Sequence, residues 1–99
     1  MVSKEEVLGV LKTVVDPEIA FNIVDLGLVY DIQVKGNSVS IKMTLTTPAC
    51  PFGPELIEEV KRKVGVLQGV GTVDVEIVWE PPWAPDKMSD YAKMELGIG

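Results

Sequence analysis

The chain has 99 residues, of which 46% are hydrophobic and 24% charged, enough for one globular domain and too few for two. Its 15 acidic and nine basic side chains give a net charge of −6, which argues against binding to nucleic acid or to an anionic membrane surface. No apolar run reaches the roughly 18 residues of a membrane span, and no signal peptide is recognisable at the start, so we expect a cytoplasmic location.

The first third of the chain predicts a helix followed by a connection. Ser3 and Glu6 fit a capping box, and apolar residues then recur at helical spacing, which predicts a helix over residues 4–14. Pro17 requires this helix to stop by Asp16. We expect residues 16–28 to connect the helix to the first strand.

The middle of the chain predicts a hairpin and a second helix. Apolar and polar residues alternate over 30–35 and again over 39–46, and Gly36-Asn37 between them is a turn. The prolines of 47–54 exclude regular structure there. Apolar residues at helical spacing then indicate a second helix that begins near Pro54.

The last third predicts a strand over residues 73–80, a segment rich in proline, and a short helix over 89–96. The predicted order is therefore α-β-β-α-β-α. Because a helix joins the second and third strands, we expect a mixed three-stranded sheet with helices packed on it, in a single two-layer α+β domain over residues 1–99. The pattern does not give the strand order.

Cys50 is the strongest candidate for chemistry. It is the single cysteine and histidine is absent, which excludes an intrachain disulfide, Cys-His catalysis, histidine zinc sites and a four-cysteine cluster site within one chain. Cys50 precedes the predicted second helix, whose N–H groups favour a thiolate, and the hydroxyls of Thr46 and Thr47 are potential donors to its sulfur. The alternative is that Cys50 is a small buried apolar residue.

Three carboxylates lie in the connection after the first helix. Asp16 and Glu18 flank Pro17, where they are candidate ligands for a metal held by the thiolate; the alternative is a helix-stop turn with solvated carboxylates. Asp25 precedes Gly27, and we expect it to cap a turn in which Gly27 has a positive φ.

The segment 80–85 presents Trp83 between prolines. Trp83 and Pro82 are candidates for a partner-binding surface, because tryptophan is enriched at the centres of interfaces; equally, Trp83 fits a core position. Trp79 continues the alternation of the third strand and is expected in the core. Met88 and Met94 are expected to pack in the core or between helices.

Four motifs together resemble the SufT/PaaD-like domain family. They are Asp16-Pro17-Glu18, the run 22–30, Thr44-Leu45-Thr46-Thr47-Pro48-Ala49-Cys50-Pro51, and Trp79-Glu80-Pro81-Pro82-Trp83. The resemblance covers essentially the whole chain. It implies the same small α/β fold and an accessory role in iron–sulfur cluster assembly or delivery to apo-proteins. It also implies that Cys50 is the reactive cysteine and that Asp16 and Glu18 form the acidic motif.

Within that resemblance several alternatives stay open. Cys50 is expected to ligate iron or a cluster transiently, with no tightly bound cofactor, and one cysteine per chain suggests a homodimer that bridges a cluster. The partners implied are the assembly machinery and apo-protein clients. A protein-interaction module that binds no cluster, or an assembly accessory of ring oxygenases in the phenylacetate pathway, remains possible. An enzyme with a Cys50 nucleophile lacks a histidine base and would need a carboxylate instead.

Overall fold

A computed structural model of the chain describes residues 2–17, 19–45 and 53–97. This part of the chain contains two short strands, a three-stranded sheet and helices. In order, the elements are α1 (Lys4–Leu11), β1 (Val15–Asp16), β2 (Phe21–Asn22), β3 (Val29–Lys35), β4 (Ser38–Met43), α2 (Gly53–Gly65), β5 (Thr72–Ile77), the 3-10 turn η1 (Pro85–Lys87) and α3 (Asp90–Leu96).

The three-stranded sheet has the order β3-β4-β5, so β3 and β5 are its edges. β3 and β4 form an antiparallel hairpin around the two-residue turn Gly36-Asn37, with Lys35 opposite Ser38. β5 runs parallel to β4, from Ser38 opposite Thr72 to Met43 opposite Ile77. The α2 connection makes this parallel pairing possible, because parallel neighbours need a long crossover. The expected mixed sheet and α+β class are confirmed.

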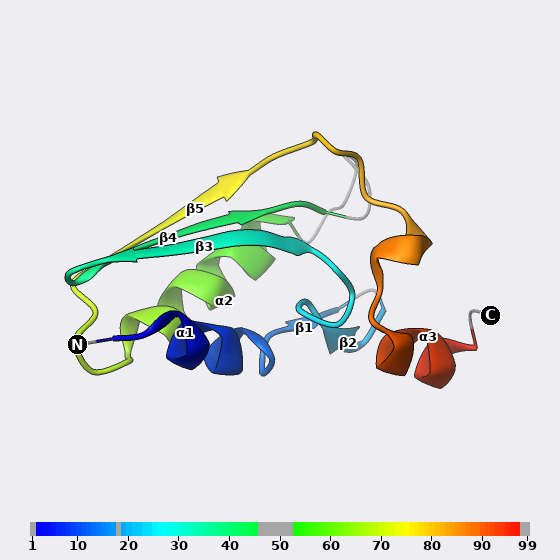
Figure 1. Cartoon of the computed structure of the whole chain (residues 1–99), viewed down its shortest axis with the longest axis horizontal. Coiled ribbons are helices and arrows are strands. Elements are labelled where there is room, and N and C mark those ends of the chain that lie inside the picture. The colour runs from blue at the N-terminus through cyan, green and yellow to red at the C-terminus, as the bar shows by residue number, and fades with distance from the viewer. Residues whose placement is uncertain (1, 18, 46–52, 98–99) are drawn as a thin grey trace.

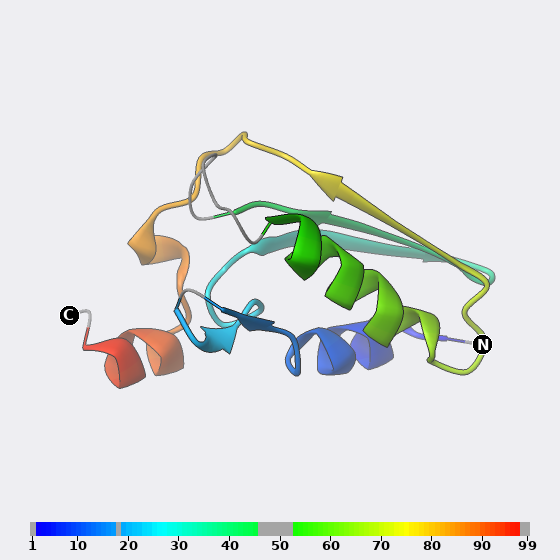
Figure 2. The same cartoon turned by 180° about the vertical axis from the view of Figure 1, so that it is seen from behind.

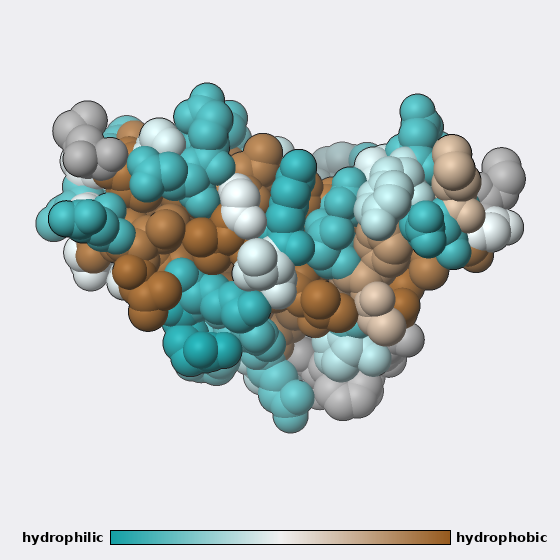
Figure 3. All heavy atoms as spheres, turned by 90° about the horizontal axis from the view of Figure 1, so that it is seen from below, coloured by the Kyte–Doolittle hydropathy of each residue, from teal (hydrophilic) through white to brown (hydrophobic). Residues whose placement is uncertain are grey.

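Helices α1 and α2 cover one face of the sheet, with α1 beneath β3 and α2 behind it (Figures 1 and 2). The core lies between these two layers and is almost entirely aliphatic. Its completely buried side chains include Val7, Leu11, Val39, Val60 and Val64. Seen from the helix side, apolar surface remains between polar patches (Figure 3). No helix in the described part of the chain is long and apolar enough to cross a membrane.

The capping box at the start of α1 is present, but the helix is shorter than predicted. Ser3 Oγ accepts from the Glu6 N–H and a Glu6 carboxylate oxygen accepts from the Ser3 N–H, both at 3.1 Å. The helix ends at Leu11. The Thr13 hydroxyl donates to the Val10 carbonyl at 2.6 Å and so satisfies a carbonyl of the last turn, and Lys63 Nζ donates to the Thr13 carbonyl just beyond the helix at 2.9 Å.

Residues 16–28 contain more structure than the sequence indicates. β1 and β2 pair as a short antiparallel hairpin beside the main sheet. Phe21 in β2 meets Tyr91 of α3, with ring centroids 5.5 Å apart, so the hairpin supports the C-terminal helix. A strand of two residues has no detectable period, which is why the pattern gave no sign of it.

Two core predictions near the C-terminus are wrong. Trp79 is 44% exposed, because β5 ends at Ile77 and the chain leaves the sheet before the alternation stops. Met94 is 78% exposed on α3, whose buried residue is Ala92. Met88 is buried, as expected.

Candidate functional site

The turn after β2 is held by a reciprocal pair of side chains. Asn22 Nδ2 donates to Asp25 Oδ2 at 2.7 Å, and the Asp25 N–H donates to Asn22 Oδ1 at 2.9 Å. The hydrogen bond from Asn22 lowers the pKa of Asp25, and burial raises it by a smaller amount. A hydrogen bond with Ser89 and the positive charge of Lys12 lower the pKa further. Asp25 is therefore an ionised carboxylate that stabilises this turn, as the sequence predicts.

The segment after β5 returns to this turn and packs against its backbone. Gly27 has a φ of +78°, and a Cβ there would lie 2.7 Å from the Lys87 carbonyl carbon. The Ser89 N–H donates to the Asp25 carbonyl at 2.8 Å, and Trp83 Nε1 donates to the Leu26 carbonyl at 2.8 Å. Only glycine permits this approach, since any other residue would place its Cβ in the neighbouring backbone.

Tyr30 at the start of β3 fixes the beginning of the same segment. Its hydroxyl donates to the Pro81 carbonyl at 2.8 Å, next to the cis Glu80–Pro81 peptide. Lys87 Nζ lies 5.3 Å from the centroid of the Tyr30 ring. Burial raises the pKa of Tyr30, against a smaller opposite effect of the Thr44 hydroxyl, so the phenol stays protonated and remains a donor.

Asp16 is the last residue of β1, where the chain turns towards β2. It is 1% exposed, its Oδ1 accepts from the Ile19 N–H at 3.3 Å, and its carbonyl accepts from the Ala20 N–H at 2.7 Å. Ala20 has a φ of +60°, a conformation that a residue with a Cβ seldom adopts. The expectation of solvated carboxylates is therefore wrong for Asp16, which organises the loop that contains Pro17.

The segment that carries Cys50 joins the end of β4 to the start of α2. Cys50, Thr46 and Thr47, together with Glu18, lie outside the described residues, so their roles remain predictions. The two flanks are close together: Leu45 is buried, and a Cβ on Gly53 would lie 3.0 Å from Leu45 Cδ1. Within the described ranges, no three cysteine or carboxylate side chains are grouped so that they could hold a metal ion.

These segments gather at one end of the molecule. The end of β4, the beginning of α2 and the Pro81–Lys87 segment lie at the end where β3 begins (Figure 1). The parallel strands β4 and β5 both finish there, and the carboxyl ends of parallel strands are a common location for ligand sites. The turn after β2, the start of β3 and the Pro81–Lys87 segment thus form a framework of turns at this end of the molecule.

Both candidate partner-binding residues lie in this framework. Pro82 is exposed. Trp83 is half-buried, and its indole N–H holds the segment to Leu26. The structure exposes Trp79 instead, four residues earlier. Sequence reasoning missed Trp79 because its alternation with Ile77 is typical of a buried strand face.

The chain is similar to known proteins over nearly its whole length. A family model described as iron–sulfur cluster assembly protein matches residues 4–75. The Fe-S protein maturation auxiliary factor YitW of Bacillus subtilis is 49% identical over 96 residues, which are 96% of this chain and 94% of that protein. The Fe-S protein maturation auxiliary factor SufT of Staphylococcus aureus is 45% identical, over 86% of this chain and 98% of that protein.

A solved structure shows the same fold. A crystal structure of a domain of unknown function, DUF59, from Bacillus anthracis superposes with a TM-score of 0.92 and is 37% identical, covering 97% of this chain and 92% of that one. The arrangement of the helices and of the mixed sheet is therefore shared with a relative of similar length.

The contact between Gly27 and Lys87 predicts a steric effect of substitution. Gly27→Ala should lower the free energy of unfolding by about 3 kcal/mol, because the new methyl group adds an overlap with backbone to the cost of a positive φ. Gly36→Ala is the matched control, with a φ of +59° and nothing within 4 Å of its Cβ; it should cost only about 1–2 kcal/mol. Urea denaturation measures both, and equal losses would contradict the steric explanation.

The lowered pKa of Asp25 predicts acid sensitivity. The ionised form is favoured in the folded state, so its stabilisation is complete above the unfolded pKa of about 3.8 and is lost as pH falls through the lower folded value. Asp25→Asn keeps the shape but removes this titration. Its free energy of unfolding should therefore fall less steeply than that of the wild type below about pH 4. Denaturant melts from pH 2 to 7 measure this, and parallel curves would disprove it.

Proposed function

Because the chain belongs to the iron–sulfur cluster assembly protein family, we propose that it is an accessory factor that helps to assemble iron–sulfur clusters or to deliver them to apo-proteins. The observation that carries this proposal is the 49% identity to an Fe-S protein maturation auxiliary factor, over 96% of this chain. A match of that extent includes both the framework and the Cys50 segment. The partners are then the assembly machinery and apo-protein clients.

In this proposal Cys50 is a thiolate that ligates iron or a cluster transiently. It lies three residues before α2, which starts at Gly53, and the free N–H groups at a helix start favour an anion. Thr46 and Thr47 supply hydroxyl donors to the sulfur, and Asp16 and Glu18 supply oxygen ligands or fix the loop. The cluster is cargo, so the ligand set stays incomplete within one chain and a client or a small thiol supplies the rest.

The proposed role needs no catalysis by this chain. A cysteine nucleophile requires a base within hydrogen-bonding distance, and the chain has no histidine. A carboxylate would have to be that base, and Asp25 is already hydrogen-bonded to Asn22. We therefore propose a cytoplasmic carrier or scaffold rather than an enzyme.

A second candidate, a docking module that recognises clients without carrying a cluster, is favoured by the exposed Trp79. A tryptophan that is 44% exposed beside Pro81 and Pro82 offers a large apolar contact on a rigid loop. An accessory of ring-oxygenase assembly would be of this class. In such a module Pro82 and the free face of Trp83 complete the docking surface.

The carrier role predicts a loss of iron binding on removal of the thiol. In anaerobic reconstitution with iron and sulfide, the wild type should take up both at a fixed ratio to chain, and Cys50→Ser should take up at least about tenfold less. Ser40→Ala, at an exposed position of β4, is the control and should bind as the wild type does. If Cys50→Ser takes up as much iron and sulfide per chain as the wild type, the carrier role is wrong.

The docking role predicts a different pattern. In pull-downs with an iron–sulfur enzyme produced without its cluster, Trp79→Ala should reduce capture about tenfold or more, as expected for an interface hot spot. Cys50→Ala should leave capture unchanged if docking alone is the function. Val66→Ala removes a side chain that is 79% exposed elsewhere on the surface and serves as the control. Capture that depends on Cys50 but not on Trp79 would favour the carrier.

A further inference from the structure

The outer edge of β3 lacks a partner strand in the described part of the chain. β3 has seven residues, from Val29 to Lys35, and its other edge pairs with β4. No described helix or strand lies in front of it, and it is the strand nearest the viewer in Figure 1. A long strand edge without proline is a template for pairing with another strand.

The hairpin geometry determines which backbone groups face this edge. Lys35 and Ser38 flank a two-residue turn and form a hydrogen-bonded pair, so Gln33 and Asp31 also bond to β4. Ile32 and Val34 alternate with them, and their N–H and C=O groups point outward. None of the backbone hydrogen bonds between described residues outside the strand ladders involves Ile32 or Val34.

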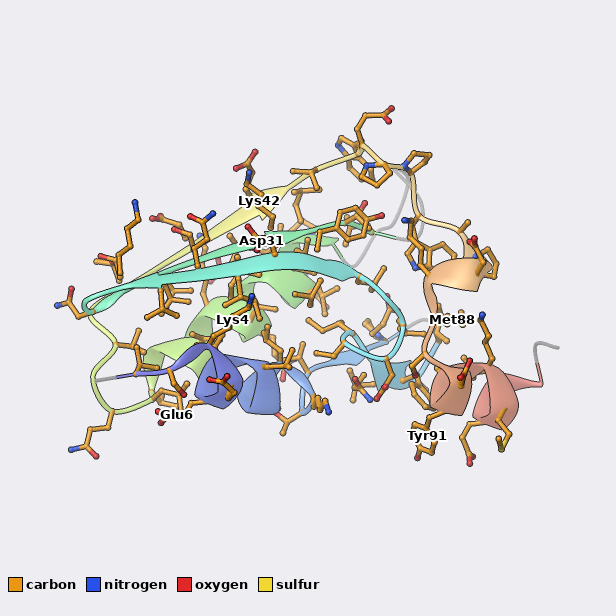
Figure 4. All side chains as sticks on the ribbon, viewed as in Figure 1. Lys4, Glu6, Asp31, Lys42, Met88 and Tyr91 are labelled. Carbon is orange, nitrogen blue, oxygen red and sulfur yellow. The ribbon has the colours of Figure 1, made fainter. Side chains whose placement is uncertain are left out.

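The charged side chains of this edge are complementary to those of the same edge in a second, antiparallel copy. Asp31 carries a negative and Lys35 a positive charge, and Asp31 projects from the sheet face opposite the helices (Figure 4). In the described residues the salt bridges are formed by Glu59 with Arg62 and Lys63, so neither Asp31 nor Lys35 is in one. Asp31 accepts a bond from Gln33 at 3.3 Å and lies opposite Lys42 on β4.

We propose that β3 pairs antiparallel with β3 of a second copy of this chain, about a two-fold axis at Gln33. Asp31 of each copy then lies opposite Lys35 of the other. These are non-hydrogen-bonded pairs, in which the side chains of the two strands lie closest together. Ile32 lies opposite Val34, so their outward backbone groups bond to each other. The two sheets become one of six strands, and the Asp31–Lys35 pair forms twice by symmetry.

The surroundings of the strand favour this register. A cavity of about 180 Å³ runs along the first half of β3 and has both apolar and charged lining residues. It is lined by Lys4 and Leu8 of α1, Val24, Val29, Tyr30, Asp31 and Ile32. Val34 of the second copy, opposite Ile32 and on the helix side, is placed to fill it. A shift of the axis to Asp31 would set two carboxylates opposite each other and is disfavoured.

The other edge of the sheet does not offer the same match. β5 carries Asp74 and Glu76 and no cation. In any antiparallel pairing of β5 with β5 of a second copy, a carboxylate therefore lies opposite another carboxylate or opposite an uncharged residue. Self-pairing is therefore specific to β3 and closes at two chains. This inference goes beyond the proposed function and does not depend on it, because metal-free chains can pair.

Charge reversal tests the pairing. Sedimentation equilibrium of metal-free protein, with reductant present to exclude disulfides, should show a wild-type monomer–dimer equilibrium. Asp31→Lys alone and Lys35→Asp alone should each raise the dissociation constant about tenfold or more, because both symmetric pairs become like-charged. An equimolar mixture of the two variants should form heterodimers at the wild-type affinity, since every Asp–Lys pair is then restored.

Matched controls separate this effect from net charge. Glu58→Lys and Lys61→Asp make the same changes of charge on the exposed face of α2 and should leave the dissociation constant unchanged. Thermal melts confirm that each variant is folded. A wild type that stays monomeric up to about 1 mM, a dimer that tolerates both reversals, or a mixture that does not recover would each overturn the proposal.

Discussion

The contact between the backbones of Gly27 and Lys87 is the constraint on which the candidate site depends. It exists because Gly27 has no side chain and holds a positive φ. The bonds from Ser89 to Asp25 and from Trp83 to Leu26 lie on either side of it and need the same close approach. Without it, the segment after β5 would lose its attachment to the turn after β2.

Several polar groups around this contact form hydrogen bonds that hold the framework together. Asn22 and Asp25 bind each other, Tyr30 binds the Pro81 carbonyl, and Asp16 holds the turn that leads to Ala20. Burying these groups is tolerated because each forms hydrogen bonds. The framework is thus pre-organised by its own hydrogen bonds.

Local signals in the sequence predict most of the elements but few of their contacts. The alternation around Gly36-Asn37 predicts the β3–β4 hairpin, and Gly27 after Asp25 predicts a positive φ, because both depend on neighbouring residues. The bond from Trp83 to Leu26 joins residues 57 apart, and no local pattern encodes it. Cys50 is a candidate from its place before a predicted helix, and the family resemblance strengthens it. The exposure of Trp79 could not be predicted, because it depends on where β5 ends.

The proposed pairing of β3 bears directly on how a single cysteine handles its cargo. In an antiparallel pair about Gln33, Val29 of one copy lies opposite residue 37 of the other, so the two site ends are separated by eight residues along the strands. At about 3.4 Å per residue this is roughly 27 Å, far more than the span of one cluster. Such a dimer would present two separate Cys50 segments instead of bridging a cluster between them. Iron uptake of half a cluster per chain would therefore require a different interface, whereas one iron or one cluster per chain, completed by small thiols or by a client, agrees with paired β3 strands.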